Sequence, residues 1–217
     1  MRTITMASVA VLGIASVLSA SVALGPHGSA RAASFNCNQA AAPSEFAICG
    51  DPQLSSLDSA IGVAYDQRLA QDPSIRQIQR GWLKARNAGC GKDRTCLRLL
   101  MTDELGWLRS GLRLSPALPT RVGACSVTTI TQVASRLDGI AGSGSNVAEA
   151  NGAMEVSYDQ IPAADGARRG DPALVCLVSL PTNCPPGDDR GKTYAVADLR
   201  TLGGWAAPDS EHMCGGA

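Results

Sequence analysis

The chain has 217 residues, and its 19 Lys and Arg residues balance 19 Asp and Glu residues. This neutral chain contains no basic run, so we expect neither nucleic acid nor an anionic membrane surface as its partner. The length suits one domain or two small ones.

Residues 1–32 have the features of a secretory signal peptide. Arg2 is followed by an uncharged apolar stretch over 4–24, and Ala30-Arg31-Ala32 offers a cleavage site of the Ala-x-Ala type. An uncleaved membrane anchor is the alternative, because the stretch approaches the ~20 residues that a span needs. The Ala and Ser content and the processing site favour cleavage, and Cys37 lacks the motif of a lipoprotein. We therefore expect a periplasmic or secreted protein with no stable membrane insertion.

All eight cysteines follow this segment, and an even number of cysteines in an exported chain predicts disulfides. A metal site is disfavoured, since His212 is the one histidine after the cleavage site and no Cys-x-x-Cys pair occurs. The cysteines form two groups of four in the chain: Cys37, Cys49, Cys90 and Cys96, then Cys125, Cys176, Cys184 and Cys214.

The segment 33–114 has the apolar spacing of an antiparallel helical module. We predict helices over 43–49, 53–71 and 73–88, and a fourth that follows Asp93 or Thr95 and ends near Arg113. Ser44 is the expected N-cap of the first helix. In the fourth helix, Glu104 alone interrupts the apolar stripe. The pairs Cys37–Cys49 and Cys90–Cys96 each close a local loop and are preferred, with the crossed pairings left open.

A proline-containing linker over 115–120 leads to a β-rich segment over 121–217. We predict strands over 126–137, 173–180, 193–199 and 204–206, and a hairpin turn at Asn151-Gly152. After this turn, Met154, Val156 and Tyr158 are expected to face the core. The preferred disulfides are Cys125–Cys214 and Cys176–Cys184. The fold class is therefore α+β, a disulfide-stapled helical module followed by a small antiparallel sandwich or barrel.

Residues 35–112 resemble the N-terminal domain of the LprI-type lysozyme inhibitors, a family of exported helical modules. Besides the cysteines of the helical segment, the resemblance is carried by an ordered set: Glu45, Ile48, Leu54, Leu57, Asp58, Tyr65, Gln79, Trp82, Leu83, Arg86 and Leu97. It implies a protein that binds lysozyme or another exported protein. The fourth helix departs from the family at 103–107. We recognise no family for the C-terminal half.

Most of these residues also have a structural interpretation. Tyr65 and Trp82 at helical spacing are typical core residues, and Asp58 and Arg86 can form an ion pair between helices. Glu45 suits the first turn of a helix, where the dipole favours a carboxylate. A partner would then contact the exposed helix faces or the turn over 91–94, and the sequence does not choose between these.

Three further motifs lie in the C-terminal half. We interpret Arg169-Gly170-Asp171 as a chance match to an adhesion tripeptide. The stretch 185–191 is a polar turn that lacks the spaced oxygens of a calcium loop. His212 lies near Asp209 and Ser210, but no nucleophile motif accompanies it.

The leading hypothesis is an exported protein-binding module that inhibits lysozyme by occluding its glycan cleft. The alternative is an envelope-interaction protein that inhibits nothing. A third is a cell-wall glycan enzyme with Glu45 and Asp58 as paired carboxylates, which we do not expect. We predict no catalytic residues, no metal ligands and no cofactor.

Overall fold

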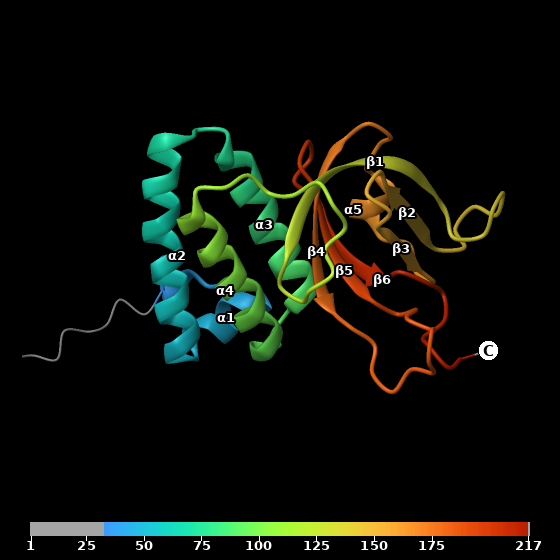
Figure 1. Ribbon diagram of the computed structural model, residues 1–217, viewed down its shortest axis with the longest axis horizontal. Coiled ribbons are helices and arrows are strands. Elements are labelled where there is room, and N and C mark those ends of the chain that lie inside the picture. Colours follow the sequence, from blue (N-terminus) through green and yellow to red (C-terminus); the bar gives the residue numbers. More distant parts are fainter. Residues whose placement is uncertain (1–32, 217) are drawn as a thin grey trace, which may run out of the picture. The chain divides into compact units, whose positions relative to one another are not determined.

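The computed structural model describes residues 33–216, so the predicted signal peptide lies outside the described residues. Helices come first along the chain and strands follow (Figure 1), which confirms the α+β class. The elements are η1 Cys37–Gln39, α1 Pro43–Cys49, α2 Pro52–Gln71, α3 Ile75–Cys90, α4 Arg94–Ser110, β1 Cys125–Ser135, β2 Ser145–Glu149, β3 Met154–Ser157, α5 Pro162–Asp165, β4 Pro172–Ser179, β5 Thr193–Asp198 and β6 Gly204–Pro208.

The start of α1 differs from the prediction. Ser44 lies inside the helix, where its hydroxyl donates to Asn87 Oδ1 at 2.7 Å. The capping acceptor is Glu45, whose Oε2 accepts from the backbone N–H groups of Ala41 at 2.8 Å and Ala42 at 3.0 Å. A carboxylate can reach back to these groups because its side chain is longer than that of serine.

The other helix ends follow ordinary capping rules. Asp51 accepts from the backbone of residues 53 and 54 at the start of α2, and Asp93 caps α4 in the same way. The third helix begins at Ile75 rather than at 73, because Asp72 accepts from both the N–H and the hydroxyl of Ser74 and holds a turn there. Gly111 ends α4 with a φ of 72°, the left-handed conformation that glycine adopts easily.

The strands form one antiparallel sheet in the order β3-β2-β1-β4-β5-β6. The sheet curls into a half-barrel, so that its edge strands β3 and β6 contact each other. A two-sheet sandwich is not formed. An apolar cluster fills the concave side of the curl and includes Ile130, Val147, Val175, Tyr194 and Trp205. Helix α5 packs against β1, β2 and β6.

Helix α3 joins the helical part to the sheet. It contacts α1, α2 and α4 and also β4, β5 and β6 (Figure 1). Glycines allow the close approach: a Cβ at Gly89 would lie 2.6 Å from that of Ala195, and one at Gly81 would collide with Leu199. Trp82 and Leu174 consequently belong to one core. The linker over 115–120 therefore does not separate two independent cores.

The orientation predicted after the Asn151-Gly152 turn is wrong for Met154 and Tyr158, whereas Val156 is buried as predicted, at 6% exposed. Met154 and Tyr158 are 39% and 56% exposed, whereas Glu155 is 2% exposed. The register explains this, because Glu155 pairs with Val147, which faces the concave core. The predicted turn at Asn151-Gly152 does connect β2 and β3.

The structure confirms two predicted disulfides, Cys37–Cys49 and Cys90–Cys96. The other two predictions are wrong, since the bonds are Cys125–Cys176 and Cys184–Cys214. The two cysteines of the first bond are direct partners in the β1–β4 ladder. In the second, Cys214 lies beside the 180–192 loop, where its N–H donates to Arg190 O at 3.0 Å.

Candidate functional site

The residues that carry the LprI resemblance divide into a buried group and an exposed group. Trp82 and Leu97 are 1% and 0% exposed, and Leu57 and Tyr65 pack half-buried against the same core. These four residues hold the helices together and offer little surface to a partner.

Asp58 and Arg86 form the predicted ion pair, but it is buried rather than superficial. Arg86 Nη1 lies 3.4 Å from Asp58 Oδ1, and their side chains are 3% and 6% exposed. The guanidinium also lies 5.3 Å from the centre of the Trp82 ring. Asp58 accepts two further bonds, from the N–H and hydroxyl of Ser34 at 2.8 and 2.6 Å. Burial lowers the pKa of Arg86, and the negative charges of Asp58 and Glu45 oppose that shift.

Glu45 extends this polar cluster toward the surface. Its hydrogen bonds from Ala41 and Ala42 lower the pKa of its carboxyl, and the charge of Arg86 adds to the effect. Asn87 Oδ1 accepts from Arg86 Nε at 3.1 Å. The two carboxylates of the enzyme hypothesis, Glu45 and Asp58, are thus both held in hydrogen bonds that stabilise the fold.

Three members of the motif, the exposed Leu83, the half-buried Glu45 and the buried Arg86, line a hollow beside α3. Glu45, Leu83 and Arg86 lie in its wall with Arg80, Lys84, Asn87 and Leu202, around a volume of about 320 Å³. A second hollow of about 490 Å³ shares Arg80 and Leu202 and continues along α3 past Arg76 and Gln77. We call the two together the α3 groove.

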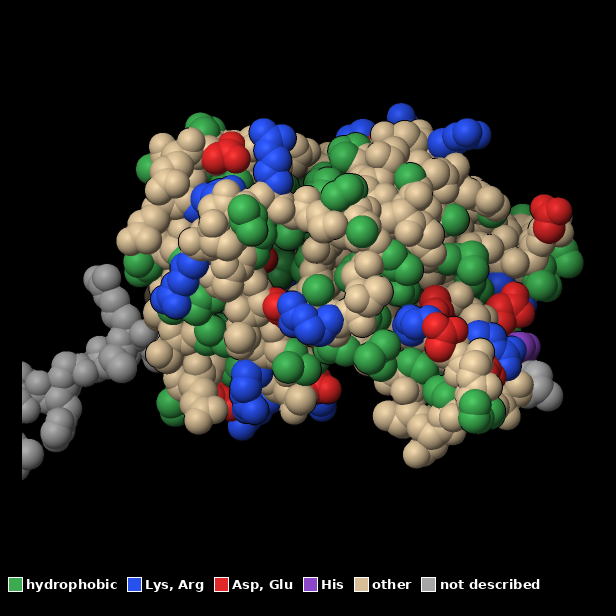
Figure 2. Space-filling model, viewed as in Figure 1, with side chains coloured by type: hydrophobic (Ala, Val, Ile, Leu, Met, Phe, Trp, Pro, Cys, Tyr) green, Lys and Arg blue, Asp and Glu red, His purple; other side chains and the backbone are tan. Residues whose placement is uncertain are grey.

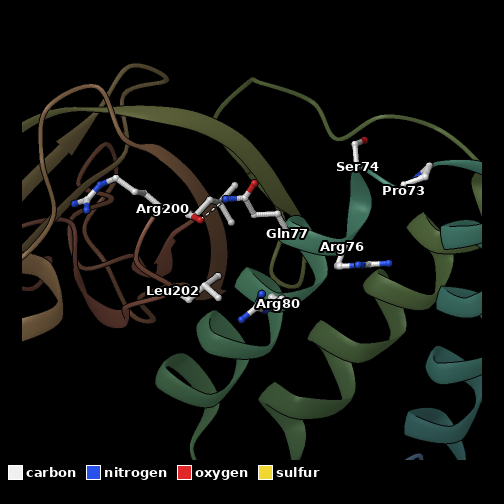
Figure 3. A pocket seen from close by; sticks show the side chains of 8 residues that line it. Pro73, Ser74, Arg76, Gln77, Arg80, Arg200 and Leu202 are labelled. Carbon is white, nitrogen blue, oxygen red and sulfur yellow. Dashed lines mark hydrogen bonds between the residues drawn. The ribbon is translucent and has the colours of Figure 1, made fainter.

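Figure 3 shows how the side chains of the second hollow lie. Arg80 reaches toward Leu202, and the Gln77 amide donates to the backbone oxygen of Leu199, which ties α3 to the β5–β6 turn. Arg76 points away from Leu202, and Arg200 turns toward the β part. Arg200 is paired with Asp171, Nε to Oδ1 at 2.7 Å.

Arg80 and Lys84 are exposed cations of the first hollow, and the exposed Arg76 lines the second. Arg80 and Lys84 lie one helical turn apart on α3, and neither forms an ion pair within the described part of the chain. Elsewhere, on the face drawn in Figure 2, basic and acidic side chains are interspersed. The first hollow can therefore offer these two cations to an acidic partner, and the second hollow adds Arg76.

The other sequence motifs have structural roles. In Arg169-Gly170-Asp171, the carboxylate is held by Arg200. In the 185–191 turn, Asp188 accepts from Arg190 at 2.8 Å. The Ser210 hydroxyl donates to the backbone oxygen of His212 rather than to its ring.

Two findings concern metals and membranes. Within residues 33–216, no three His, Cys, Asp or Glu side chains are grouped so that they could hold a metal ion. Among the helices of the same range, none has the length and apolar character that crossing a membrane requires.

Two groups of buried acids were not predicted as sites. Glu149 and Glu155 lie in the concave core at 4% and 2% exposure, and Glu104 in α4 is 4% exposed. The sequence did point to the burial of Glu104, because this residue interrupts the apolar stripe predicted for α4. The strand pattern gave no signal for Glu155, because its register with β2 is a tertiary property.

Comparisons with protein-family models, with curated proteins and with solved structures found no match. The LprI resemblance accordingly rests on the residues named above.

Proposed function

We propose that this protein is an exported protein-binding module that contacts its partner through the α3 groove. One observation carries the proposal: two residues of the LprI-like motif, the half-buried Glu45 and the exposed Leu83, line the same hollow as the cations Arg80 and Lys84, which form no ion pair among the described residues. The remaining motif residues are accounted for by the core. Arginine and an exposed apolar side chain in one hollow suit a protein interface.

Two disulfides hold the helices around the groove in place, which supports a role in binding. Cys37–Cys49 fixes the start of α1, and Cys90–Cys96 fixes the turn between α3 and α4. Such cross-links lower the ordering cost of an interface. The disulfides also fit a protein of extracellular type, and we place it in the periplasm or outside the cell, with 1–32 as its signal peptide.

Lysozyme is the first partner to test, because the resemblance implies it. A glycan-cleaving enzyme carries a pair of carboxylates in its cleft. Arg80 and Lys84 could meet such carboxylates with charge-assisted hydrogen bonds, which are stronger than neutral ones. Inhibition of this kind requires no catalytic group on the inhibitor.

The test is lysis of bacterial cell walls by lysozyme with the purified mature protein added. We expect slower lysis at micromolar excess, and a loss of inhibition of about tenfold or more for Arg80→Glu/Lys84→Glu, since like charges then face each other. Arg109→Glu/Arg169→Glu makes the same charge change at exposed positions outside the groove and should inhibit normally. Unchanged lysis with the wild type would remove the inhibitor proposal.

A second candidate is an envelope-interaction protein that inhibits nothing. The helical part and the sheet share one core, because α3 packs on β4, β5 and β6. Either half expressed alone would expose this packed surface. Pull-down from periplasmic extract should therefore use the whole mature chain. A partner that is lost with Arg80→Glu/Lys84→Glu, in a protein that leaves lysis unchanged, would favour this candidate.

The enzyme hypothesis has its own assay, which is turnover of purified peptidoglycan by the protein alone. We expect no turnover, because Glu45 and Asp58 are both engaged in the fold.

A further inference from the structure

Leu202 has a backbone conformation that leucine rarely adopts. Its φ is 60°, in the left-handed region, and among the described residues the other non-glycine residue with a positive φ is Asn183. Asparagine tolerates this region because its short polar side chain can bond to the nearby backbone, whereas a bulky leucine is strained there. Such outliers cluster at functional positions. The turn alone does not explain a leucine here, since glycine would adopt the same conformation without strain.

The fold enforces this conformation through the β5–β6 turn, residues 199–203. Asp198 is fully buried, and its Oδ1 accepts from the Arg200 N–H at 2.7 Å while its Oδ2 accepts from the Thr201 hydroxyl at 2.8 Å. The backbone oxygen of Asp198 accepts from the Leu202 N–H at 2.8 Å. None of these bonds uses the Leu202 side chain, so the turn holds its backbone and leaves the side chain for another role.

The Leu202 side chain lines the α3 groove rather than filling a core. It is half-buried, and neither apolar cluster of the described residues includes it. It lies in the wall of both hollows, and Figure 3 shows Arg80 reaching toward it. In the first hollow the exposed Leu83 is a second apolar wall residue. The strained turn therefore presents an apolar side chain to the groove.

Two contacts hold this turn against α3. The Gln77 amide donates to the backbone oxygen of Leu199. At the other end of the turn, β6 begins so close to the helix that a Cβ at Gly204 would lie 2.9 Å from the backbone oxygen of Lys84. The position of Leu202 relative to the side chains of α3 is thus fixed before any partner arrives, which lowers the ordering cost of binding.

A row of exposed cations runs along the same helix. Arg76, Arg80 and Lys84 are spaced four residues apart, which is ~6 Å per step along the axis. None of them forms an ion pair among the described residues. Glu45, the acid in the wall, has its Oε2 engaged by two backbone N–H groups. Side chains on one side of an extended chain recur every ~6.6 Å, so alternate carboxylates of such a chain match the spacing of the row.

We propose that the α3 groove recognises an extended acidic segment of an exported partner protein, whose alternate carboxylates pair with Arg80 and Lys84 and whose neighbouring apolar side chain packs on Leu83 and Leu202. The inference rests on the proposed function, because it concerns the same groove. The cations supply charge complementarity and a faster encounter. The apolar contact supplies the specificity, since an anionic polymer without apolar groups can satisfy the cations alone.

The experiment titrates isotope-labelled mature protein with short peptides and follows its backbone amide signals by NMR. The test peptide is acetyl-Gly-Asp-Ser-Asp-Leu-Gly-amide, and the signals that shift should be those of α3 and of residues 199–203. One control peptide has Asn at both Asp positions, a second has Ser in place of Leu, and a third has a further Asp in place of Leu. Loss of the leucine should weaken binding about tenfold, and loss of both carboxylates about threefold or more.

Variants assign the two roles. Leu202→Gly removes the side chain and suits the left-handed backbone, so it should melt within a few degrees of the wild type while losing the preference for the leucine peptide over the serine peptide. Leu83→Ala keeps a good helix former and should reduce this preference in part. Arg80→Glu/Lys84→Glu should abolish binding of every acidic peptide. Leu180→Gly is the matched control, at an exposed leucine outside the groove, and should bind as the wild type does.

The outcomes separate this inference from the proposed function. If Arg80→Glu/Lys84→Glu abolishes lysozyme inhibition while Leu202→Gly binds every peptide as the wild type does, the groove binds a partner but the apolar contact is wrong. Equal affinity of the wild type for the leucine peptide and for the peptide with three Asp residues would also overturn the inference, and would favour an anionic polymer as the occupant. Absence of binding by any peptide would overturn it as well, whereas the lysis and pull-down assays decide the proposed function.

Discussion

Trp205 on β6 donates a hydrogen bond to Glu155 on β3, with Nε1 3.4 Å from Oε2. These two strands are the opposite edges of the sheet order. The curl of the sheet brings the edges into contact, and the bond joins them inside the core. We call this contact between β3 and β6 the seam. Glu149 on β2 lies next to Glu155, so two carboxyl groups lie at the seam.

This seam should make stability fall as pH rises. Burial raises the pKa of both acids, and the charge of Glu149 raises that of Glu155 further. The folded state thus keeps protons that the unfolded chain releases above about pH 4.5. Because the folded pKa values are raised, the stabilisation is complete below the unfolded pKa and is lost as pH rises through the folded values. Calorimetric melting temperatures should therefore decrease from about pH 5 to pH 8.

Glu155→Gln tests the assignment. It removes one of the two acids while keeping an acceptor for Trp205, so the slope of melting temperature against pH should become shallower. At about pH 8 the variant should melt a few degrees above the wild type, as about 1 kcal/mol shifts the midpoint by ~2–4 °C at this size. Burial also raises the pKa of Glu104 to about 8, so Glu104→Gln should flatten the slope independently. Parallel curves for Glu155→Gln and wild type would contradict the role of the seam.

Features that depend on residues close together in the chain could be predicted from the sequence, whereas contacts between distant residues could not. Local signals succeeded, as in the capping Asp93 and the short loop closed by Cys90–Cys96. The pairing of Cys125 with Cys176 requires the β1–β4 ladder, which joins residues 51 positions apart. No local pattern specifies that pairing.

The candidate site shows the same division. The motif predicted that Asp58 and Arg86 would pair, since both lie on helices that had been placed correctly. The α3 groove also needs Leu199, Arg200 and Leu202 of the β part, and the composition of the linker gave no reason to expect these residues beside α3. The spacing of Gly81, Ala85 and Gly89 along α3 was the available signal, because small residues at every fourth position allow close packing.

Gly89→Ala should destabilise the protein by about 1–3 kcal/mol, the cost of overpacking a well-filled core. The added methyl group would meet Ala195 Cβ at 2.6 Å and Val178 Cγ1 at 2.9 Å, and both neighbours are on strands that cannot easily move. Gly81→Ala should cost less, because it meets the flexible end of Leu199. Urea unfolding followed by circular dichroism measures both changes.

Gly106→Ala is the matched control for these variants. Gly106 lies within α4, and an added Cβ there has no neighbour within 4 Å. Helix propensity alone should then stabilise the protein by about 0.5–1 kcal/mol. A neutral Gly89→Ala would show that α3 does not pack tightly on the sheet in solution.

Replacing one member of the buried Asp58–Arg86 ion pair should destabilise the protein more than replacing both members. Arg86→Met leaves Asp58 buried without its cation, and Asp58→Asn leaves Arg86 without its anion, so each should destabilise by about 3–5 kcal/mol. The double variant should lose clearly less than the sum, since neither charge is then stranded. Additive losses in a double-mutant cycle would indicate that the two side chains do not interact.

The disulfides of the β part should differ in their reactivity toward a mild reductant. One sulfur of the Cys125–Cys176 bond is closed off, since Cys176 is 0% exposed and only Cys125 is half-buried, whereas Cys184 and Cys214 are both half-buried outside the core. Thiolate attack requires access to a sulfur atom, so native reduction followed by alkylation should label Cys184 and Cys214 before Cys125 and Cys176. Peptide mass analysis of the unreduced protein should recover the same two pairs. A peptide joining Cys125 to Cys214, or simultaneous labelling of all four, would contradict this arrangement.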